Sequence, residues 1–192
     1  MSKGRLEAFS DGVLAILITI LVLELKVPHG ESWTALRAMA PTFCAYLLSF
    51  IFVGIYWNNH HHMLQLTQQI NGKILWANLH LLFWLSLVPF ATAWMGETHL
   101  APLPTAAYGG VLLFAGVAYV VLQSAIVAHQ GADSPLAAAI GHDVKGRASA
   151  ILYAAAIPLA FVRAWIAAAI YVFVALMWLV PDPRIEGRIQ PE

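Results

Sequence analysis

The stretch RLEAFSDGVLAILITILVLELKV, residues 5–27, determines how the rest of the chain is interpreted. It is charged near both ends and runs apolar over residues 13–23, where Thr19 supplies the only hydroxyl. A helix that crosses a bilayer takes about 20 mostly apolar residues. We therefore expect a membrane-spanning helix here, and no small-residue cleavage site of the kind that ends a secretory signal peptide follows it.

The start of this helix can be argued from its length. The residues Ser10, Asp11 and Gly12 are typical of a turn or a helix N-cap. A helix running from Gly12 to Val27 would be about 24 Å long at about 1.5 Å per residue, which is short of a hydrocarbon core of about 30 Å. We therefore expect the helix to begin near Arg5 and to include Ser10 and Asp11.

The composition of the chain is typical of a membrane protein. Of its 192 residues 60% are hydrophobic and 10% are charged, and its mean hydropathy is +0.74. A soluble domain has about 25% charged residues, so the excess of apolar residues is expected to face lipid. The formal net charge of +0 gives no indication of nucleic acid as a partner.

Six segments are long and apolar enough to cross a bilayer. They are expected at residues 5–27, 34–62, 74–95, 104–128, 148–162 and 164–180. Pro89 is expected to bend the third segment, and the last two form a hairpin that turns at Arg163. The polar connection over residues 129–147 has room for a short surface helix. The sequence thus predicts an all-α membrane protein, with residues 1–192 forming a single domain.

The distribution of basic residues predicts the orientation. With six spans, both chain ends lie on the same side of the membrane. That side holds Lys3, Arg5, Lys73, Lys145, Arg147, Arg184 and Arg188. The opposite side holds Lys26, Arg37 and Arg163. Because cytoplasmic loops carry the excess of Lys and Arg, both termini are expected in the cytoplasm and the chain in the plasma membrane.

No motif of an enzyme or a metal centre stands out. The consecutive residues His60, His61 and His62 invite a metal-site interpretation. Consecutive residues on a helix point about 100° apart, so these three cannot jointly hold one ion, and no HExxH-type pair is present. The cluster is expected to lie at the membrane interface, where it could bind a metal or respond to pH.

The first helix carries a stripe at helical spacing. Its members are Gly12, Ile16, Thr19, Ile20 and Leu23. From periodicity alone such a stripe faces lipid or packs in a helix bundle.

Several motifs together resemble one known family. They are Arg5-x-x-x-Phe9-Ser10-Asp11 in the first helix, Trp57-x-x-His60 in the second, and Asn78 and LSLVPFAT in the third. This combination resembles the bacterial relatives of the lysosomal potassium channel called transmembrane protein 175. The motifs cover about the first half of the chain, and the remainder agrees with the family only in its hydropathy.

The resemblance implies a homotetramer whose central pore is lined by the first helix of each subunit. It places Ile16 at the tightest hydrophobic ring, Thr19 at a hydroxyl layer linked to potassium preference, and Ile20 and Leu23 in the wider outer part. It also implies a packed polar network off the ion path, formed by Arg5, Phe9, Ser10, Asp11, His60 and Asn78. Within that network a buried Asp11 carboxylate would need partners, and Arg5, Ser10 and His60 are the candidates.

The implied function is a cation channel with modest selectivity for potassium. A ring of isoleucines cannot ligate an ion and can gate by dewetting, while threonine hydroxyls beyond it could replace some of the lost water. The expected partners are potassium ions, the lipid bilayer and further copies of the chain, without a cofactor. The alternatives are a secondary ion- or proton-coupled transporter, which would usually show repeated halves, and a metal- or haem-binding bundle that uses His60, His61, His62 and His80.

Overall fold

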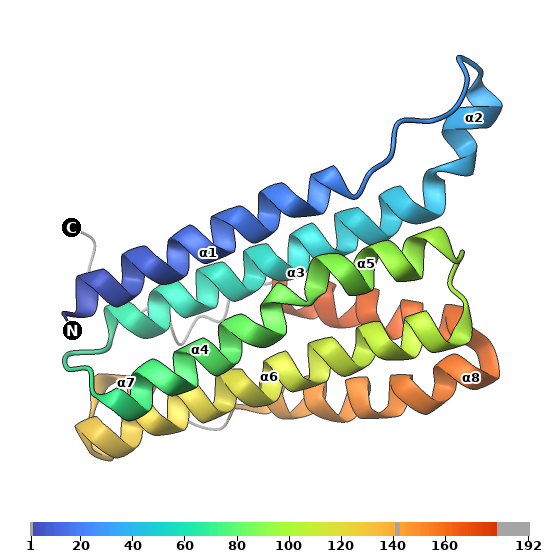
Figure 1. Ribbon diagram of the computed structural model, residues 1–192. Coiled ribbons are helices and arrows are strands. Elements are labelled where there is room, and N and C mark those ends of the chain that lie inside the picture. Colours follow the sequence, from blue (N-terminus) through green and yellow to red (C-terminus); the bar gives the residue numbers. More distant parts are fainter. Residues whose placement is uncertain (1, 141–142, 180–192) are drawn as a thin grey trace.

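The computed structural model describes residues 2–140 and 143–179, and these residues form a bundle of helices (Figure 1). The helices are α1 (Lys3–Leu23), α2 (Trp33–Ala38), α3 (Ala40–Gln65), α4 (Gly72–Ser86), α5 (Val88–Glu97), α6 (Pro102–Gln130), α7 (Pro135–Ile140) and α8 (Val144–Leu179). By length and hydropathy, five stretches of the described chain could cross a membrane. The prediction of an all-α, multi-pass membrane protein is confirmed to that extent.

Helix α1 begins at Lys3, so Ser10 and Asp11 are helical as the length argument predicted. Its 21 residues span about 30 Å at about 1.5 Å each. The predicted end at Val27 is wrong, because the helix stops at Leu23. Beyond it the chain turns away, and Lys26 forms an ion pair with Glu97 at the end of α5.

The second predicted span, residues 34–62, is divided in two. The short helix α2 is capped by the Ser32 hydroxyl, which accepts a hydrogen bond from the Ala35 backbone N–H at 3.2 Å. Met39 separates it from α3, whose second residue is Pro41. Proline cannot donate a backbone hydrogen bond to the preceding turn, so the ladder of helical hydrogen bonds is interrupted here. Helix α3 also runs past the predicted end to Gln65.

The bend predicted at Pro89 is confirmed. Helix α4 ends at Ser86 and α5 begins at Val88, with Pro89 in its first turn. Pro89 has no N–H for the carbonyl four residues earlier, so the ladder of helical hydrogen bonds is interrupted there. The two helices together form one candidate span, Gly72–Glu97.

The predicted turn at Arg163 lies inside α8. This residue has φ −155° and ψ 100°, which are not helical values, and the chain reverses direction there (Figure 1). The predicted spans 148–162 and 164–180 correspond to the two halves of this element, of which residue 180 lies outside the described residues. The first half starts earlier than predicted, at Val144. The surface helix expected between the fourth and fifth spans is α7.

Helix α1 lies along one side of the bundle, and α6 and α8 lie on the opposite side (Figure 1). Helix α1 packs against α3, α4 and α5, and α6 packs against α4, α5 and α8. One hydrophobic cluster joins α1, α3, α4 and α6. A second joins α3, α5, α6 and α8. The pore-lining candidate is therefore attached to the bundle through α3, α4 and α5.

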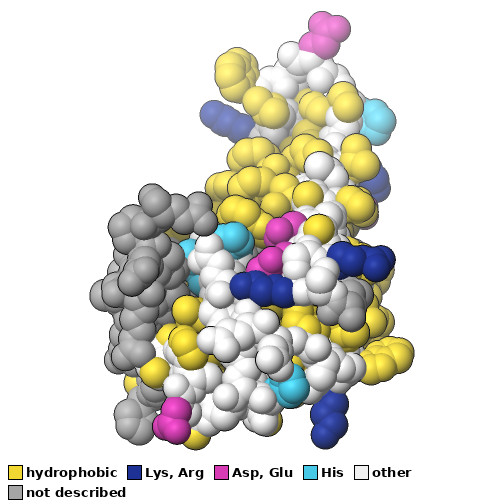
Figure 2. All heavy atoms as spheres, turned by 90° about the vertical axis from the view of Figure 1, so that its left-hand side faces the viewer, with side chains coloured by type: hydrophobic (Ala, Val, Ile, Leu, Met, Phe, Trp, Pro, Cys, Tyr) yellow, Lys and Arg dark blue, Asp and Glu magenta, His cyan; other side chains and the backbone are white. Residues whose placement is uncertain are grey.

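The two ends of the bundle are formed by different elements. The N-terminus, the α3–α4 turn and the start of α8 lie at one end, and α2 and the Arg163 turn lie at the other (Figure 1). Figure 2 shows the first end, where basic, acidic and histidine side chains gather. This is the end predicted to be the more basic one, although Arg184 and Arg188 lie outside the described residues.

Candidate functional site

Helix α1 has two different faces. The residues of its buried face are Leu6, Ser10, Leu14, Leu17 and Leu21. Four residues of the stripe identified in the sequence (Gly12, Ile16, Thr19 and Leu23) lie two positions after a residue of this face, which places them about 200° around the helix. Accordingly Ile16 is 58% exposed, Ile20 36% and Leu23 77% in the subunit. A large apolar surface of this kind in a subunit marks a contact with lipid or with another protein chain.

Thr19 belongs to the exposed stripe and its hydroxyl is held in one orientation. Its Oγ1 donates to the Ile16 carbonyl at 2.8 Å. This bond uses the hydroxyl hydrogen, so the oxygen lone pairs remain available outside the helix. A hydroxyl arranged in this way can accept a hydrogen bond from water or coordinate a cation.

Three of the six predicted network residues come together on the buried side of α1. Ser10, His60 and Asn78 come from α1, α3 and α4, and each is at most 1% exposed. The amide Nδ2 of Asn78 donates to the Ser10 hydroxyl at 3.0 Å. The Oδ1 of Asn78 lies 2.7 Å from the Nε2 of His60. One side chain of α4 thus connects the pore-lining candidate to α3.

This hydrogen-bond chain runs in one direction. The Ser10 hydroxyl donates to the Leu6 carbonyl at 2.9 Å, so it accepts from Asn78. The Oδ1 of Asn78 is an acceptor, so the donor toward it is the Nε2–H of His60. The Nδ1 of His60 is buried and has no hydrogen-bond partner among the described residues. The imidazole is therefore held through one nitrogen.

Asp11 does not join this chain. Its Oδ1 accepts a hydrogen bond from the Nε1 of Trp57 at 3.1 Å. The expected partners Arg5, Ser10 and His60 are replaced by this indole, because Asp11 sits about 100° from Ser10 around the helix. Arg5 is exposed, and Phe9 is 49% exposed. Both therefore lie on the surface of the subunit, outside the buried hydrogen-bond chain.

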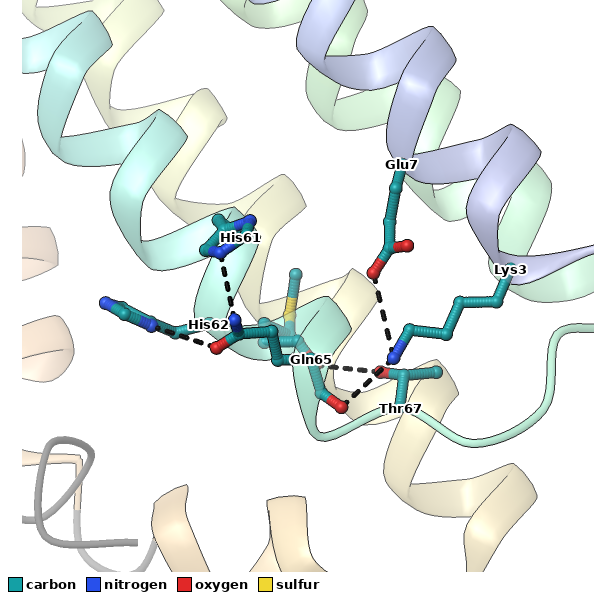
Figure 3. A network of polar contacts seen from close by, with 7 residues as sticks. Lys3, Glu7, His61, His62, Gln65 and Thr67 are labelled. Atoms are coloured by element: carbon teal, nitrogen blue, oxygen red, sulfur yellow. Dashed lines mark hydrogen bonds and ion pairs between the residues drawn. The ribbon is translucent and has the colours of Figure 1, made fainter. Parts of the chain in front are cut away.

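His61 and His62 lie at the basic end of the bundle in a separate polar network (Figure 3). The Gln65 side chain lies 3.0 Å from the Nε2 of His61 and 3.4 Å from the Nδ1 of His62. The Gln65 carbonyl accepts from the Nζ of Lys3 at 3.1 Å, and Lys3 also pairs with Glu7. Among the described residues no three His, Cys, Asp or Glu side chains are placed to hold a metal ion.

Sequence reasoning missed a second buried polar cluster. The Ser49 hydroxyl lies 2.6 Å from that of Thr92 and 2.9 Å from that of Tyr108. These side chains connect α3, α5 and α6. Hydroxyls inside apolar spans usually hydrogen-bond between helices, and that signal was present at all three positions. Trp57 was recognised as a motif residue, but its bond to Asp11 was not expected.

The chain is similar in sequence to known channel proteins. Residues 5–89 match the family described as "Endosomal/lysosomal potassium channel TMEM175". A potassium channel of Chryseobacterium sp. (strain P1-3) is 55% identical over 190 residues, which is 99% of each chain. A human protein named endosomal/lysosomal proton channel TMEM175 is 43% identical over 75 residues, which is 33% of this chain and 15% of that protein.

The fold also matches a solved structure. It is the crystal structure of a lysosomal potassium-selective channel TMEM175 homolog from Chamaesiphon minutus. The TM-score is 0.82 at 30% sequence identity, and the match covers 93% of this chain and 96% of the other. The likeness therefore includes the second half of the chain, where no sequence motif had indicated the family.

Proposed function

The chain belongs to the TMEM175 family, a family of ion channels rather than enzymes, and on that premise we propose that it forms a potassium-preferring cation pore. The observation that carries this proposal is the apolar stripe on α1, which points away from the subunit's own core. The names of the bacterial relatives, which are potassium channels, support the choice of ion.

The proposed pore is formed by four subunits around a common axis. One α1 helix per subunit cannot enclose a channel alone, and closed cyclic symmetry is the usual arrangement of identical chains. Burying the stripe of Ile16, Ile20 and Leu23 toward that axis removes its apolar surface from lipid. The exposed side chains of Phe9 and Trp57 lie outside the subunit core as well, so they are available for contacts between subunits.

Ile16 is assigned to the constriction of this pore and Thr19 to a neighbouring hydroxyl layer. A ring of isoleucines offers no ligand, so an ion sheds part of its water to pass. Potassium holds its water less tightly than sodium and loses less by this step. The Thr19 hydroxyl already donates its hydrogen to the Ile16 carbonyl. Its oxygen can therefore coordinate the potassium ion in place of one of the lost water molecules. The result is a modest preference for potassium.

The proposed membrane arrangement has six crossings. The two halves of α8 on either side of Arg163 each cross once, because the backbone there is extended and the chain reverses. With an even number of crossings both termini lie on one side. The excess of Lys and Arg counted in the sequence for that end supports a cytoplasmic location for it, in a protein of the plasma membrane.

The proposal is tested with purified protein in liposomes. Potassium, sodium and proton fluxes are compared in vesicles of identical lipid, with protein-free vesicles as the control, and the oligomer mass is measured on the same sample. A tetramer with potassium flux above sodium flux is the expected result. A monomeric protein would contradict the pore, and a saturable exchange flux would favour the transporter instead.

A further inference from the structure

Helix α4 carries polar side chains on two opposite faces. Asn78 lies on the buried face, where its amide donates to α1. His80 follows two residues later, about 200° around the helix, and it is exposed in the subunit. Its neighbours on that side are apolar, since Trp76, Leu79 and Phe83 are 75%, 42% and 55% exposed. These three residues and His80 are called the outer face of α4.

The His80 ring is held in one orientation. Its Nε2 accepts a hydrogen bond from the Nε1 of Trp84 at 3.0 Å. Trp84 is itself fixed, because its ring stacks on that of Phe114 in α6 with the centroids 4.6 Å apart. An indole nitrogen can only donate, so the hydrogen of the neutral imidazole is on Nδ1. That N–H has no hydrogen-bond partner among residues 2–140 and 143–179.

His80 lies within the apolar part of its membrane span. It is eight residues after Gly72, where both α4 and the candidate span begin, and therefore about 12 Å along the helix. The span has 26 residues, or about 39 Å, against a hydrocarbon core of about 30 Å. Centring the span in the bilayer thus puts His80 inside the core. An unpaired N–H is costly in lipid, so we expect the outer face of α4 to contact protein.

The position of α4 in the subunit indicates which protein this is. Helix α4 packs against α1 and against α6, and these two helices lie on opposite sides of the bundle (Figure 1). When the α1 helices of several subunits surround a common axis, α6 and α8 are turned outward to lipid. The flank between α1 and α6, which α4 forms, then faces the next subunit. This step rests on the proposed pore.

Helix α3 provides a second exposed apolar face next to α1. It also packs against α1, and Phe43, Leu47 and Phe50 on it are 51%, 47% and 41% exposed. Gly54 continues this face, and a Cβ there would meet no described atom within 4 Å. A glycine lets a neighbouring membrane helix approach closely. Because each subunit of a closed ring uses two different faces, α4 and α3 supply a suitable pair.

We propose that the outer face of α4 packs on the exposed face of α3 in the adjacent subunit, and that the Nδ1–H of His80 donates to that subunit. The depths of the two faces agree. Gly54 is 11 residues before Gln65, the last residue of α3, and so about 16 Å from the end of the bundle at which His80 is about 12 Å deep. Through Asn78 and His80, α4 then connects its own pore-lining helix to the neighbouring subunit.

The first test replaces His80 in the full chain. The tetramer fraction is measured by native mass spectrometry across a dilution series in detergent. His80→Leu is expected to lower the association constant about threefold for each hydrogen bond lost. His80→Gln keeps a donor and an acceptor, so it should retain most of the association. If His80→Leu left the tetramer unchanged or stabilised it, the outer face of α4 would contact lipid and the proposal would be overturned.

A second variant tests the facing helix without altering His80 or its bond to Trp84. Gly54→Leu adds bulk to the exposed face of α3 and is expected to lower the association constant about tenfold or more, as overpacking does. The control is Gly110→Leu on α6, where a Cβ also meets no described atom within 4 Å. Both changes improve helix propensity equally. Equal tetramer fractions for the two leucine variants would contradict the proposed contact.

The original chain separates this inference from the proposed pore. If it is monomeric, both the pore and the contact between α4 and α3 are wrong. If it forms conducting tetramers that neither His80→Leu nor Gly54→Leu weakens, the pore stands and the contact is wrong. The unfolding temperature of each variant is measured as well, so that a loss of association is not mistaken for misfolding of the subunit.

Discussion

The Thr19 hydroxyl donates its hydrogen to the Ile16 carbonyl at 2.8 Å. This bond joins the two residues assigned to the constriction and to the hydroxyl layer of the proposed pore. It fixes the side chain of Thr19 and leaves its oxygen free on the exposed face. The role of this oxygen can be tested by a substitution that removes it and keeps the shape of the side chain.

Replacing Thr19 by valine is expected to lower the potassium-to-sodium flux ratio by about twofold or more, since one hydroxyl contact contributes about 0.5–1.5 kcal/mol. Conduction itself should persist, because valine has nearly the same volume. Thr19→Ser keeps the hydroxyl and should keep the ratio. The ratios are measured as fluxes from liposomes. If valine and serine give the same ratio, Thr19 does not contribute to selectivity.

Replacing Ile16 by alanine is expected to raise cation flux. If the smaller side chain lowers the barrier at the ring by about 1.4 kcal/mol, the flux rises about tenfold. The matched control is Ile151→Ala, which removes the same atoms from another exposed isoleucine, on α8. Stopped-flow flux at equal protein density measures both. A flux that Ile16→Ala leaves unchanged would remove Ile16 from the ion path.

Replacing Asn78 by alanine is expected to destabilise the subunit. The change leaves the Nε2–H of His60 and one acceptor site of Ser10 without a partner in a buried site. An unsatisfied buried group costs about 1–3 kcal/mol. The control is Asn59→Ala, because the amide nitrogen of Asn59 donates to the Ile55 carbonyl of its own helix and to no other helix among the described residues. Unfolding in mixed detergent and SDS micelles measures both, and equal losses would contradict the bridging role of Asn78.

The Lys26–Glu97 ion pair predicts a dependence on alkaline pH. The hydrogen bond to Glu97, together with its charge, raises the pKa of Lys26 above its ordinary value of 10.5. A raised lysine pKa stabilises the fold below pH 10.5, and that contribution disappears as pH rises through the higher folded value. The stabilisation that this pair gives should therefore be constant between pH 7 and 9. Above about pH 10.5 it should decrease, which lowers the unfolding temperature.

The variant Lys26→Met isolates that contribution. Its unfolding temperature should lie slightly below that of the original chain at pH 8, and the difference should shrink above about pH 10.5 as Lys26 loses its proton. Because both side chains are exposed, added salt should also reduce the difference. A difference that stays constant from pH 8 to 11 would contradict the assignment.

Features governed by local chemistry could be predicted from the sequence. The length argument placed Ser10 and Asp11 inside α1, and proline chemistry predicted the bend at Pro89. The turn at Arg163 follows from one cation between two apolar runs. The same logic applied to Pro41 would have predicted the end of α2, but the apolar run across that position concealed it.

Contacts between helices could be predicted only in part. The family resemblance named Ser10, His60 and Asn78, and the structure joins these three residues. It also named Arg5 and Phe9, which lie on the surface of the subunit. Asp11 turned toward Trp57 because a rotation of about 100° separates it from Ser10. Which side of a helix meets which neighbour depends on packing, and spacing along the chain alone does not determine that.

The direction of the hydrogen bonds from His60 through Asn78 to Ser10 limits which side chains these three positions can take in this fold. The middle position must accept a hydrogen bond at one atom and donate one at another. An ionised aspartate cannot donate, and a leucine can do neither. Replacing all three residues by apolar ones of matching shape is nearly neutral, whereas replacing one is not. A single substitution at position 10, 60 or 78 is thus expected to cost more stability than the joint replacement of all three.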